Sequence, residues 1–480
     1  MVSFSRQTIA PTEAPALMQS NCSVSSRQRR VQRHATHCDA FRFFNLLTAP
    51  ALFNALEASL PTHRERLFSP TETLSMFMAQ AMKPDRSCQG VVDDAAVARL
   101  RHGLPLCSTK TGAYCKARQR LPLEMVSGLT VTAGRLLAEQ VPEKWKWNWH
   151  GRRVRLVDGT TVTLPDTPAN QAIYPQQSGQ KPGLGFPICR IVGITCLGSG
   201  ALLNAAMGKF KGKGGDEQTL LRSLLDTLEA GDLLLGDAYY ATYFLLVELV
   251  RRGVDAVFEQ HGARQRSTDF SLGRDLGHRD HLITLSKPKL RPDWMTVELY
   301  ESAPATLTVR ELEVGGKVLT TTLVCPKTVP KAELKALYRR RWHVELDIRN
   351  IKTILGMETL SCKTPPMGEK EMWVYFLAYN LIRLIMLQSA LLADVLPRTL
   401  SFKHTLQLWL AGGNELNRES DDEKTTAFLA LVAAKTVGNR PGRIEPRAVK
   451  RRPKSYPLLM QTRAAARAHV REFGHPKKVK

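Results

Sequence analysis

The chain has 480 residues, of which 43% are hydrophobic and 23% charged, and these proportions are those of folded globular proteins. They exclude a largely disordered or a collagen-like chain, and at roughly 100 to 200 residues per domain the length predicts two to four domains. The 68 Lys and Arg residues outnumber the 44 Asp and Glu residues, which gives a formal net charge of +24. A surplus of this size predicts a polyanionic partner, either nucleic acid or an anionic membrane surface.

The features that would favour a membrane are weak. The first 30 residues contain no apolar core of a signal peptide. The best candidate for a membrane span, Met372 to Leu396, is interrupted by Asn380 and Arg383, which are costly in hydrocarbon, so we interpret it as a buried core helix. The nine cysteines include no Cys-x2-Cys pair, which argues against a zinc or redox site and favours a reducing cytoplasm. We therefore expect no membrane contact and favour nucleic acid as the partner.

The first third of the chain is predicted to be helical. Residues 1–40 are basic and lack apolar periodicity, so we expect them to be mobile. From 41 to 145 the apolar residues recur at helical spacing, which predicts a small helical domain. Within it, Ser108 to Arg120 carries one Tyr and four cations and suits a helix laid against phosphates. A solvated charged face is an equally good interpretation.

Beyond residue 150 the pattern switches to period two. Arg153 to Asp158 and Thr161 to Leu164 are predicted to be the strands of a β-hairpin with a Gly-containing turn, which puts Asp158 at a strand end. Strands and helices then alternate: a strand at 188–196, a helix at 216–229, a strand at 233–237, a helix at 242–252 and a strand at 254–259. This order predicts an α/β domain with a mixed central sheet.

The next segment of the chain, residues 261–328, reads as an all-β insertion. Its alternating segments lie at 296–300, 305–314 and 317–324. A long helix is predicted from about Pro330 to Leu355, because no Gly or Pro occurs between Lys331 and Ile354.

Two acids lie at predicted strand ends. Asp158 closes the first strand of the sheet, and Asp237 follows the apolar run Leu233 to Gly236. Either acid alone is most simply read as a residue that caps a strand-to-turn transition. A third acid that converges on the same point would favour a catalytic reading.

The long helix supplies such an acid. With Tyr338 at zero and about 100° per residue, Arg341, Glu345 and Lys352 fall at about 300°, 340° and 320°, so all four share one face. Asp347 falls at about 180° and cannot sit beside them. A stripe of this composition suits a charged cleft, whereas an i, i+4 salt bridge between Arg341 and Glu345 on a solvated face is the alternative.

The spacing Tyr338-x2-Arg341-x3-Glu345-x6-Lys352 resembles the YREK signature of bacterial insertion-sequence DDE transposases, the family of insertion sequence four. Val157-Asp158-Gly159-Thr160 and Gly236-Asp237-Ala238-Tyr239-Tyr240 resemble the first and second acidic motifs of that family, in the family's order. The resemblance covers about residues 152–396. It implies an α/β fold with a ribonuclease H-like (RNase H-like) mixed-sheet core and a β-rich insertion before the Glu-bearing helix.

With the resemblance, each region of the chain receives an expected role. The expected regions are a basic N-terminus (1–40), a helical DNA-binding domain (41–145), the first part of the RNase H-like core (150–260), the β-rich insertion (261–328), the second part of the core with the Glu-bearing helix (329–396) and a basic C-terminal region (397–480).

The resemblance implies that Asp158, Asp237 and Glu345 are the catalytic residues and hold two divalent ions, Mg²⁺ or in its place Mn²⁺. Three adjacent carboxylates need cations to stay ionised, and ligands that are all oxygen favour these two metals. Two ions would stabilise both the attacking and the leaving oxygen of a phosphodiester substitution.

The resemblance also implies the partners. Tyr338, Arg341 and Lys352 would hold DNA phosphates near the cleavage point, as Arg does bidentately and Lys as a point charge. The expected function is a transposase that cleaves double-stranded DNA at the terminal inverted repeats of a transposon and joins the end to target DNA by cut-and-paste transposition. It would act as a dimer in the synaptic complex, on the chromosome in the bacterial cytoplasm.

Several aromatic residues lie off the charged stripe. Trp342 and His343 fall at about 40° and 140°, and we expect both to pack in the core. Some relatives carry a Trp near the last strand of the insertion that stacks on a flipped base. The corresponding segment here, 317–324, has no Trp, and Trp294 is a substitute that lies earlier in the chain. Base flipping and a hairpin intermediate therefore stay open.

Two other functions remain as alternatives. A DNA-binding regulator of transposition would keep the fold and the basic surfaces without cutting, but the intact set of three acids argues against it. A metal-dependent nuclease with a similar core would hydrolyse DNA without joining it. The terminal regions and the YREK spacing weigh against that second alternative.

Overall fold

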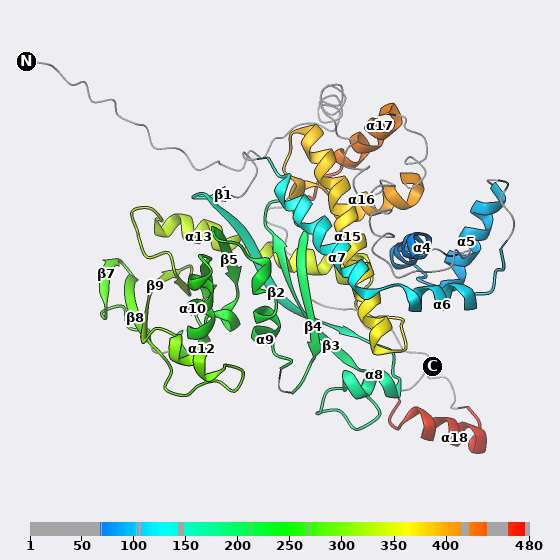
Figure 1. The fold of residues 1–480 in the computed structure, drawn as a ribbon, viewed down its shortest axis with the longest axis horizontal. Coiled ribbons are helices and arrows are strands. Elements are labelled where there is room, and N and C mark those ends of the chain that lie inside the picture. The colour runs from blue at the N-terminus through cyan, green and yellow to red at the C-terminus, as the bar shows by residue number, and fades with distance from the viewer. Residues whose placement is uncertain are drawn as a thin grey trace, which may run out of the picture.

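The structure, a computed structural model, describes residues 68, 70–101, 103, 107–142, 148–212, 214–265, 268–413, 422–438 and 459–475. The predicted basic N-terminus, the first part of the predicted helical domain and much of the basic tail lie outside these residues. A large mixed sheet runs through the middle of the molecule, with helices packed around it (Figure 1).

In the described part of the chain one ten-stranded sheet forms, in the order β4-β3-β2-β5-β6-β10-β9-β8-β7, with β1 paired to β2. Its strands are β1 (Asn148–Trp149), β2 (Arg152–Thr163), β3 (Ile188–Cys196), β4 (Leu202–Lys209), β5 (Asp232–Gly236), β6 (Asp255–Glu259), β7 (Arg274–Gly277), β8 (Asp280–Ser286), β9 (Thr306–Val314) and β10 (Lys317–Thr321). The pairs β4-β3 and β3-β2 are antiparallel, β2-β5 and β5-β6 are parallel, and the rest are antiparallel. The predicted α/β class with a mixed sheet is therefore confirmed.

The helices come from both ends of the chain and from the connections between strands. They are α4 (Pro70–Met82), α5 (Cys88–Arg101), α6 (Gly112–Arg120), α7 (Leu123–Glu139), α8 (Pro168–Ile173), α9 (Glu217–Arg222), α10 (Tyr243–Arg251), α11 (Gly262–Gln265), α12 (Val297–Ser302), α13 (Lys331–Arg339), α14 (Trp342–Arg349), α15 (Pro365–Ala393), α16 (Phe402–Leu408), α17 (Asp422–Ala433) and α18 (Arg463–Phe473). Short 3₁₀ turns occur at η1 (Leu225–Thr227), η2 (Ala238–Tyr240) and η4 (Pro397–Thr399), and π-helical turns at η3 (Asn350–Ile354) and η5 (Trp409–Gly413).

Two helical layers cover opposite faces of the central strands. Every residue of β5 is buried, as expected for a parallel strand covered on both sides. On one face Val157 and Leu234 pack with residues of α9 and α10, and on the other Leu156 and Leu235 pack with α13 and α14. The alternation of side chains along β2 thus directs its even-numbered residues, Asp158 included, toward α13 and α14.

Helix α15 is the central helix of the largest hydrophobic cluster, where it meets α4, α7 and α17. It has the length and hydropathy of a membrane span, but 89% of its most apolar window is buried inside the protein. The two residues that interrupt its apolar sequence have partners there: Asn380 bonds to the backbone of Leu202 and Thr130, and Arg383 pairs with Asp347. The prediction of a buried core helix is confirmed.

The predicted hairpin is wrong, because β2 is one continuous strand and Asp158 lies within it. Gly159 is not in a turn but extended along the strand, and it pairs with Val192 of β3. The sequence analysis also missed β4, so the three antiparallel strands are β2, β3 and β4 rather than two short strands and β3. The Gly at position 159 reflects a close approach of another side chain, which is described below.

Three further elements differ from the prediction. The helix predicted over 216–229 ends at Arg222 and gives way to η1. The strand predicted at 296–300 is helix α12, whose first turn is capped by the Thr296 side chain, so the insertion is not all-β. Its strands also do not form a separate sheet, because β10 pairs with β6 and extends the central sheet.

The long helix predicted from Pro330 to Leu355 is interrupted. The amides of Arg340 and Arg341 bond to the carbonyls three residues before them, and this tighter turn separates α13 from α14. Trp342, expected to pack, follows this break and is 58% exposed. His343 is partly buried as expected, and burial, followed by the charge of Arg398, lowers its pKa to about 4.

The segment Ser108 to Arg120 was interpreted either as a helix that contacts phosphates or as a solvated charged face. For two residues of helix α6 the structure supports neither interpretation. Tyr114 and Arg118 are buried, and both contact the Gln80 side chain of α4. They therefore serve the packing between helices rather than a surface that meets phosphates. The remaining cations of the segment, Lys110, Lys116 and Arg120, keep some exposure.

Candidate active site

The parallel pairing of β2 and β5 sets the first two acids side by side. Leu156 is opposite Leu235 in this register, and Asp158 and Asp237 each follow two residues later. Gly236 ends β5, and Asp237 then caps η2, with its Oδ1 accepting a hydrogen bond of 2.9 Å from the Tyr239 amide. Asp237 therefore follows the end of β5, as the sequence predicted, and Asp158 lies within the neighbouring strand β2.

Asp158 is largely enclosed, with 17% of its side chain exposed. Its Oδ1 accepts a hydrogen bond of 2.8 Å from the Gly159 amide. Burial raises the pKa of Asp158 to about 6, and the negative charges of Asp237 and Glu217 add to that rise. The neighbouring acids thus make ionisation of Asp158 unfavourable unless a cation is close.

Helix α14 carries Glu345, and Arg341 at the start of this helix contacts both Glu345 and Asp158. The guanidinium of Arg341 lies 3.0 Å from Glu345 Oε1 and 3.8 Å from Asp158 Oδ2. The i, i+4 pair considered in the sequence analysis is therefore formed, but it lies beside the acids of the sheet rather than on a solvated face. Arg341 is the cation that links the helix acid to the strand acid.

The other two residues of the signature have different settings. Tyr338 is buried and donates its hydroxyl proton to the carbonyl of Gly236, 3.3 Å away, so it packs against the end of β5. Burial raises its pKa, which keeps the hydroxyl a donor. Lys352 lies in the π-helical turn η3 and is partly exposed.

Within the described residues no three His, Cys, Asp or Glu side chains already enclose a point where a metal ion could sit. Asp158 and Glu345 are instead turned toward Arg341. The donor set nevertheless fits a hard divalent cation, since it consists of carboxylate oxygens, and the raised pKa of Asp158 shows that Arg341 alone does not neutralise it.

Asp347, two residues after Glu345, has a structural role that the sequence analysis did not identify. It is fully buried and pairs with Arg383 of α15 at 2.6 Å and with Arg398 of η4 at 2.8 Å. The prediction that it lies away from Glu345 is in accord with these contacts. A substitution of Asp347 would therefore leave two arginines without their partner, and it is unsuitable as a neutral control.

Sequence analysis also missed Glu217, the first residue of α9, whose charge acts on Asp158. Its position in the sequence could have indicated it, because Glu217 is an acid at the start of the helix that precedes β5.

Trp294 of the insertion is 41% exposed and stacks on Arg222, the last residue of α9, at 3.8 Å from the guanidinium to the ring centre. Helix α9 therefore begins with Glu217 and ends with Arg222, which contacts the exposed Trp294.

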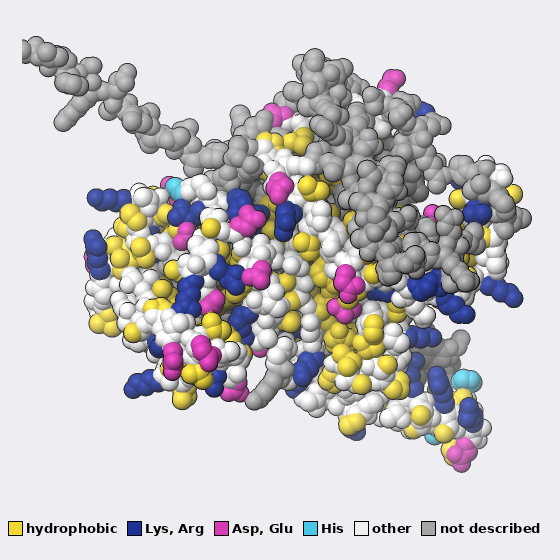
Figure 2. All heavy atoms as spheres, in the orientation of Figure 1, with side chains coloured by type: hydrophobic (Ala, Val, Ile, Leu, Met, Phe, Trp, Pro, Cys, Tyr) yellow, Lys and Arg dark blue, Asp and Glu magenta, His cyan; other side chains and the backbone are white. Residues whose placement is uncertain are grey.

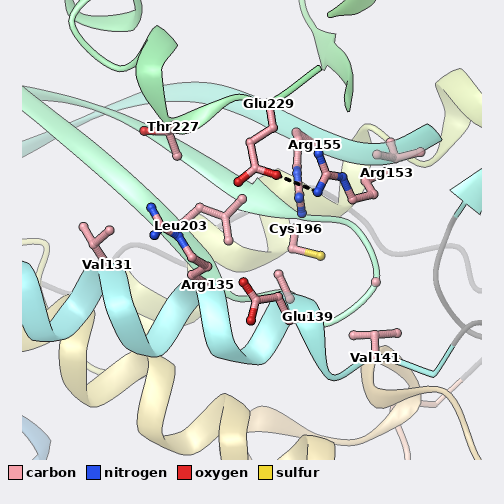
Figure 3. Close-up of a pocket in the computed structure, with 13 residues that line it drawn as sticks. Val131, Arg135, Glu139, Val141, Arg153, Arg155, Cys196, Leu203, Thr227 and Glu229 are labelled. Carbon is pink, nitrogen blue, oxygen red and sulfur yellow. Dashed lines mark hydrogen bonds and ion pairs between the residues drawn. The ribbon is translucent and has the colours of Figure 1, made fainter. Parts of the chain in front are cut away.

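A separate cavity of about 170 Å³ lies between α7 and the strands β2 and β4, and Figure 3 shows the side chains that line it. Arg153 and Arg155 reach it, but Arg153 pairs with Glu229 at 2.7 Å and Arg155 with Asp232 at 3.2 Å. Because none of the three acids lines this cavity and its strand arginines are already paired, we attribute no chemistry to it.

Basic side chains are distributed widely over the surface. On the face shown in Figure 2, Lys and Arg gather near the end of the insertion and again over α18 and its surroundings. In α18 the arginines Arg463, Arg467 and Arg471 recur every fourth residue and are exposed. This distribution agrees with the predicted polyanionic partner.

Comparisons with known proteins place the acids within one family region. Residues 149–381 match the transposase DDE domain. The chain is 29% identical over 356 residues, which are 72% of this chain and 77% of the other, to the transposase InsG for insertion sequence element IS4 of Escherichia coli (strain K12). It is also 29% identical over 109 residues, 22% of this chain and 36% of the other, to the putative transposase InsZ of the same strain.

Among solved structures, a piggyBac transposase synaptic complex with hairpin DNA aligns with a TM-score of 0.42 at 9% identity, covering 86% of this chain and 88% of that one.

Proposed function

This chain belongs to the DDE transposases and is similar to those of the insertion sequence four family, and on that premise we propose how its residues carry out DNA transposition. The reaction is metal-dependent cleavage of double-stranded DNA at the terminal inverted repeats of the element, followed by transfer of the cut end to target DNA. Two observations carry the proposal: Asp158 and Asp237 each follow a paired position of the parallel strands β2 and β5 by two residues, and Arg341 contacts both Asp158 and Glu345.

The three carboxylates are proposed to hold two Mg²⁺ ions, or Mn²⁺ in their place. Bound there, these ions would supply Lewis acidity to the attacking and leaving oxygens of the phosphodiester. The strand order β4-β3-β2-β5-β6, with Asp158 on β2 and Asp237 directly after the parallel strand β5, supports an RNase H-like core. Asp158 is the acid most in need of the cation, because burial raises its pKa to about 6.

Two phosphoryl transfers follow in sequence. Water adds its oxygen to the phosphorus at the transposon boundary while the bond to the 3′ oxygen breaks, which leaves a 3′-hydroxyl and a 5′-phosphate. That 3′-hydroxyl then adds to a target phosphodiester, and the displaced target oxygen leaves as a 3′-hydroxyl. Arg341 and Lys352 are proposed to hold the phosphate charge, as the signature implies.

The partners are proposed from the same premise. The chain would bind terminal repeats and target DNA through its basic surface, including the arginines of α18, and would act as a dimer because two ends must be brought together. It would do so on the chromosome in the bacterial cytoplasm. A non-cutting regulator is not favoured, since the three acids of the site are present together with the DDE domain.

The test is cleavage of a labelled duplex that carries the end of the element, with Mg²⁺ or Mn²⁺ present. We expect wild type to nick at the repeat boundary and Asp158→Asn, Asp237→Asn and Glu345→Gln each to lower the rate by on the order of a thousandfold. Asp226→Asn and Glu301→Gln are matched controls, because both acids are exposed and lie outside the site. Binding of the repeat without any cleavage by wild type would contradict the proposal and favour the regulator.

A further inference from the structure

Glu217 reaches the site from the side of the sheet opposite to α14. It follows Asp216, which caps α9 by accepting a hydrogen bond of 3.0 Å from the Thr219 amide. The neighbouring Leu220 and Leu221 pack with Val157 on the α9 face, whereas Val344 of α14 packs on the other. The two helices therefore hold Glu217 and Glu345 on opposite sides of β2.

The carboxylate of Glu217 occupies the space that a side chain at position 159 would fill. A Cβ atom added to Gly159 would lie 2.2 Å from Glu217 Cδ and 2.4 and 2.5 Å from its two carboxylate oxygens. Gly159 directly follows Asp158, and its backbone is in an ordinary extended conformation. A glycine is needed here because of the close carboxylate and not because of the backbone conformation.

The buried Tyr240 connects Glu217 with the second acid. Its hydroxyl donates to Glu217 Oε2 at 3.2 Å, and its residue lies in the turn that Asp237 caps. Burial, and then the charges of Glu217, Asp158 and Asp237, raise the pKa of Tyr240, so the charges of all three acids act on one phenol hydroxyl.

Among the described residues, the counter-charge that pairs with Glu217 is distant. Arg190 Nε is 3.9 Å from Glu217 Oε1, which is too far for a hydrogen bond, although one quarter of the Glu217 side chain is exposed. The Arg190 guanidinium is engaged elsewhere, since it donates to the Gly215 carbonyl at 3.1 Å and stacks on Phe210. A largely enclosed carboxylate with no closer cationic partner among the described residues suits a cation-binding role.

We propose that Glu217 is a fourth carboxylate of the acid site, which approaches the divalent cation bound by Asp158 and Asp237 from the α9 side of the sheet. This inference rests on the proposed function and deepens it, since it adds a metal-binding residue outside the three acids of the signature. Gly159 is then a second requirement of the site, because any side chain there would displace the fourth acid.

The test measures Mn²⁺ binding to the full chain without DNA, by calorimetric titration or by the loss of free Mn²⁺ signal in electron paramagnetic resonance. Glu217→Gln keeps the size of the side chain and the acceptor for Tyr240, and we expect it to weaken Mn²⁺ binding by about ten- to a hundredfold. Glu301→Gln, an exposed Glu of α12, should bind as wild type does. The urea midpoint of Glu217→Gln should match that of wild type.

Gly159→Ala gives an independent check. Its new methyl group must push the Glu217 carboxylate away, so we expect Mn²⁺ binding to weaken about as much as in Glu217→Gln. In a Glu217→Ala background the space is free, and Gly159→Ala should then have little further effect on Mn²⁺ binding. Equal losses from Gly159→Ala in both backgrounds would overturn the link between the two residues.

The outcomes separate this inference from the function on which it rests. If wild type binds Mn²⁺ and cleaves DNA, and Glu217→Gln binds Mn²⁺ as tightly while Asp158→Asn does not, only the fourth carboxylate is overturned. If Glu217→Gln lowers the urea midpoint but leaves Mn²⁺ binding intact, Glu217 is an anchor of α9. If wild type neither binds Mn²⁺ nor cleaves, the proposed function fails as well.

Discussion

Helix α14 carries two acids, two residues apart, that lie in opposite kinds of surroundings. Asp347 is fully buried, and Arg383 and Arg398 satisfy both of its oxygens. Glu345 is 34% exposed and shares its one arginine, Arg341, with Asp158. The fully paired acid joins the helix to the core, and the incompletely paired acid is the one for which we propose a catalytic role. The two acids differ in the number of their arginine partners and in how far those arginines are buried, rather than in residue type.

The largest effect on stability is expected at the buried acid. Asp347→Ala leaves two buried arginines without a counter-charge, and we expect it to lower the free energy of unfolding by about 3 to 5 kcal/mol. Glu345→Ala removes a partly exposed i, i+4 pair and should change it by less than about 1 kcal/mol. Urea unfolding of both variants measures the difference, and equal losses would break the comparison.

A smaller effect on the free energy of unfolding is expected when Asp158 loses its proton in the metal-free protein. Burial raises its pKa from the ordinary 3.8 to about 6, so between these values the folded chain keeps a proton that the unfolded chain has released. The stability is therefore full below about pH 4 and is lost as pH rises through 6, by about 2 to 3 kcal/mol.

The measurement for Asp158 is urea unfolding in a metal chelator from pH 4 to 7, compared with Asp158→Asn. The difference in unfolding free energy between wild type and variant should move in favour of the variant as pH rises. A difference that stays constant with pH would show that the site does not penalise the charge of Asp158. Added Mn²⁺ should restore the stability of wild type at pH 7 and leave the variant less affected.

The smallest effect is expected at Tyr338, which the signature assigns to DNA and the structure buries against Gly236. Tyr338→Phe removes one hydrogen bond, and we expect a loss of about 1 kcal/mol in unfolding free energy with a cleavage rate close to that of wild type. Arg341→Gln serves as the comparison and should lower cleavage with little change in stability. If Tyr338→Phe instead lowers cleavage tenfold or more without destabilising the chain, Tyr338 acts in cleavage, as proposed for Glu345, rather than in stability, as Asp347 does.

Local patterns in the sequence predicted much of this protein. The apolar run before Asp237 predicted a buried strand, and β5 confirms it. The segment from Met372 to Leu396 was predicted to be a core helix in spite of Asn380 and Arg383, and α15 confirms that as well. The spacing of the YREK signature, with the DDE domain that matches residues 149–381, assigned the family. These features depend on neighbours in sequence, which periodicity and spacing record directly.

Only the tertiary structure decided the features that depend on contacts between distant segments. Gly159 looked like part of a turn and is extended, because it pairs with Val192 of β3 within β2. The Glu217 carboxylate, 58 positions later, occupies the space that a side chain at this position would fill. Trp342 looked like a core residue and is exposed, directly after the tighter turn at Arg340 and Arg341 that separates α13 from α14. Whether an acid is paired and buried, as Asp347 is, or open, as Glu345 is, depends on arginines brought in by other helices, and local sequence does not record that.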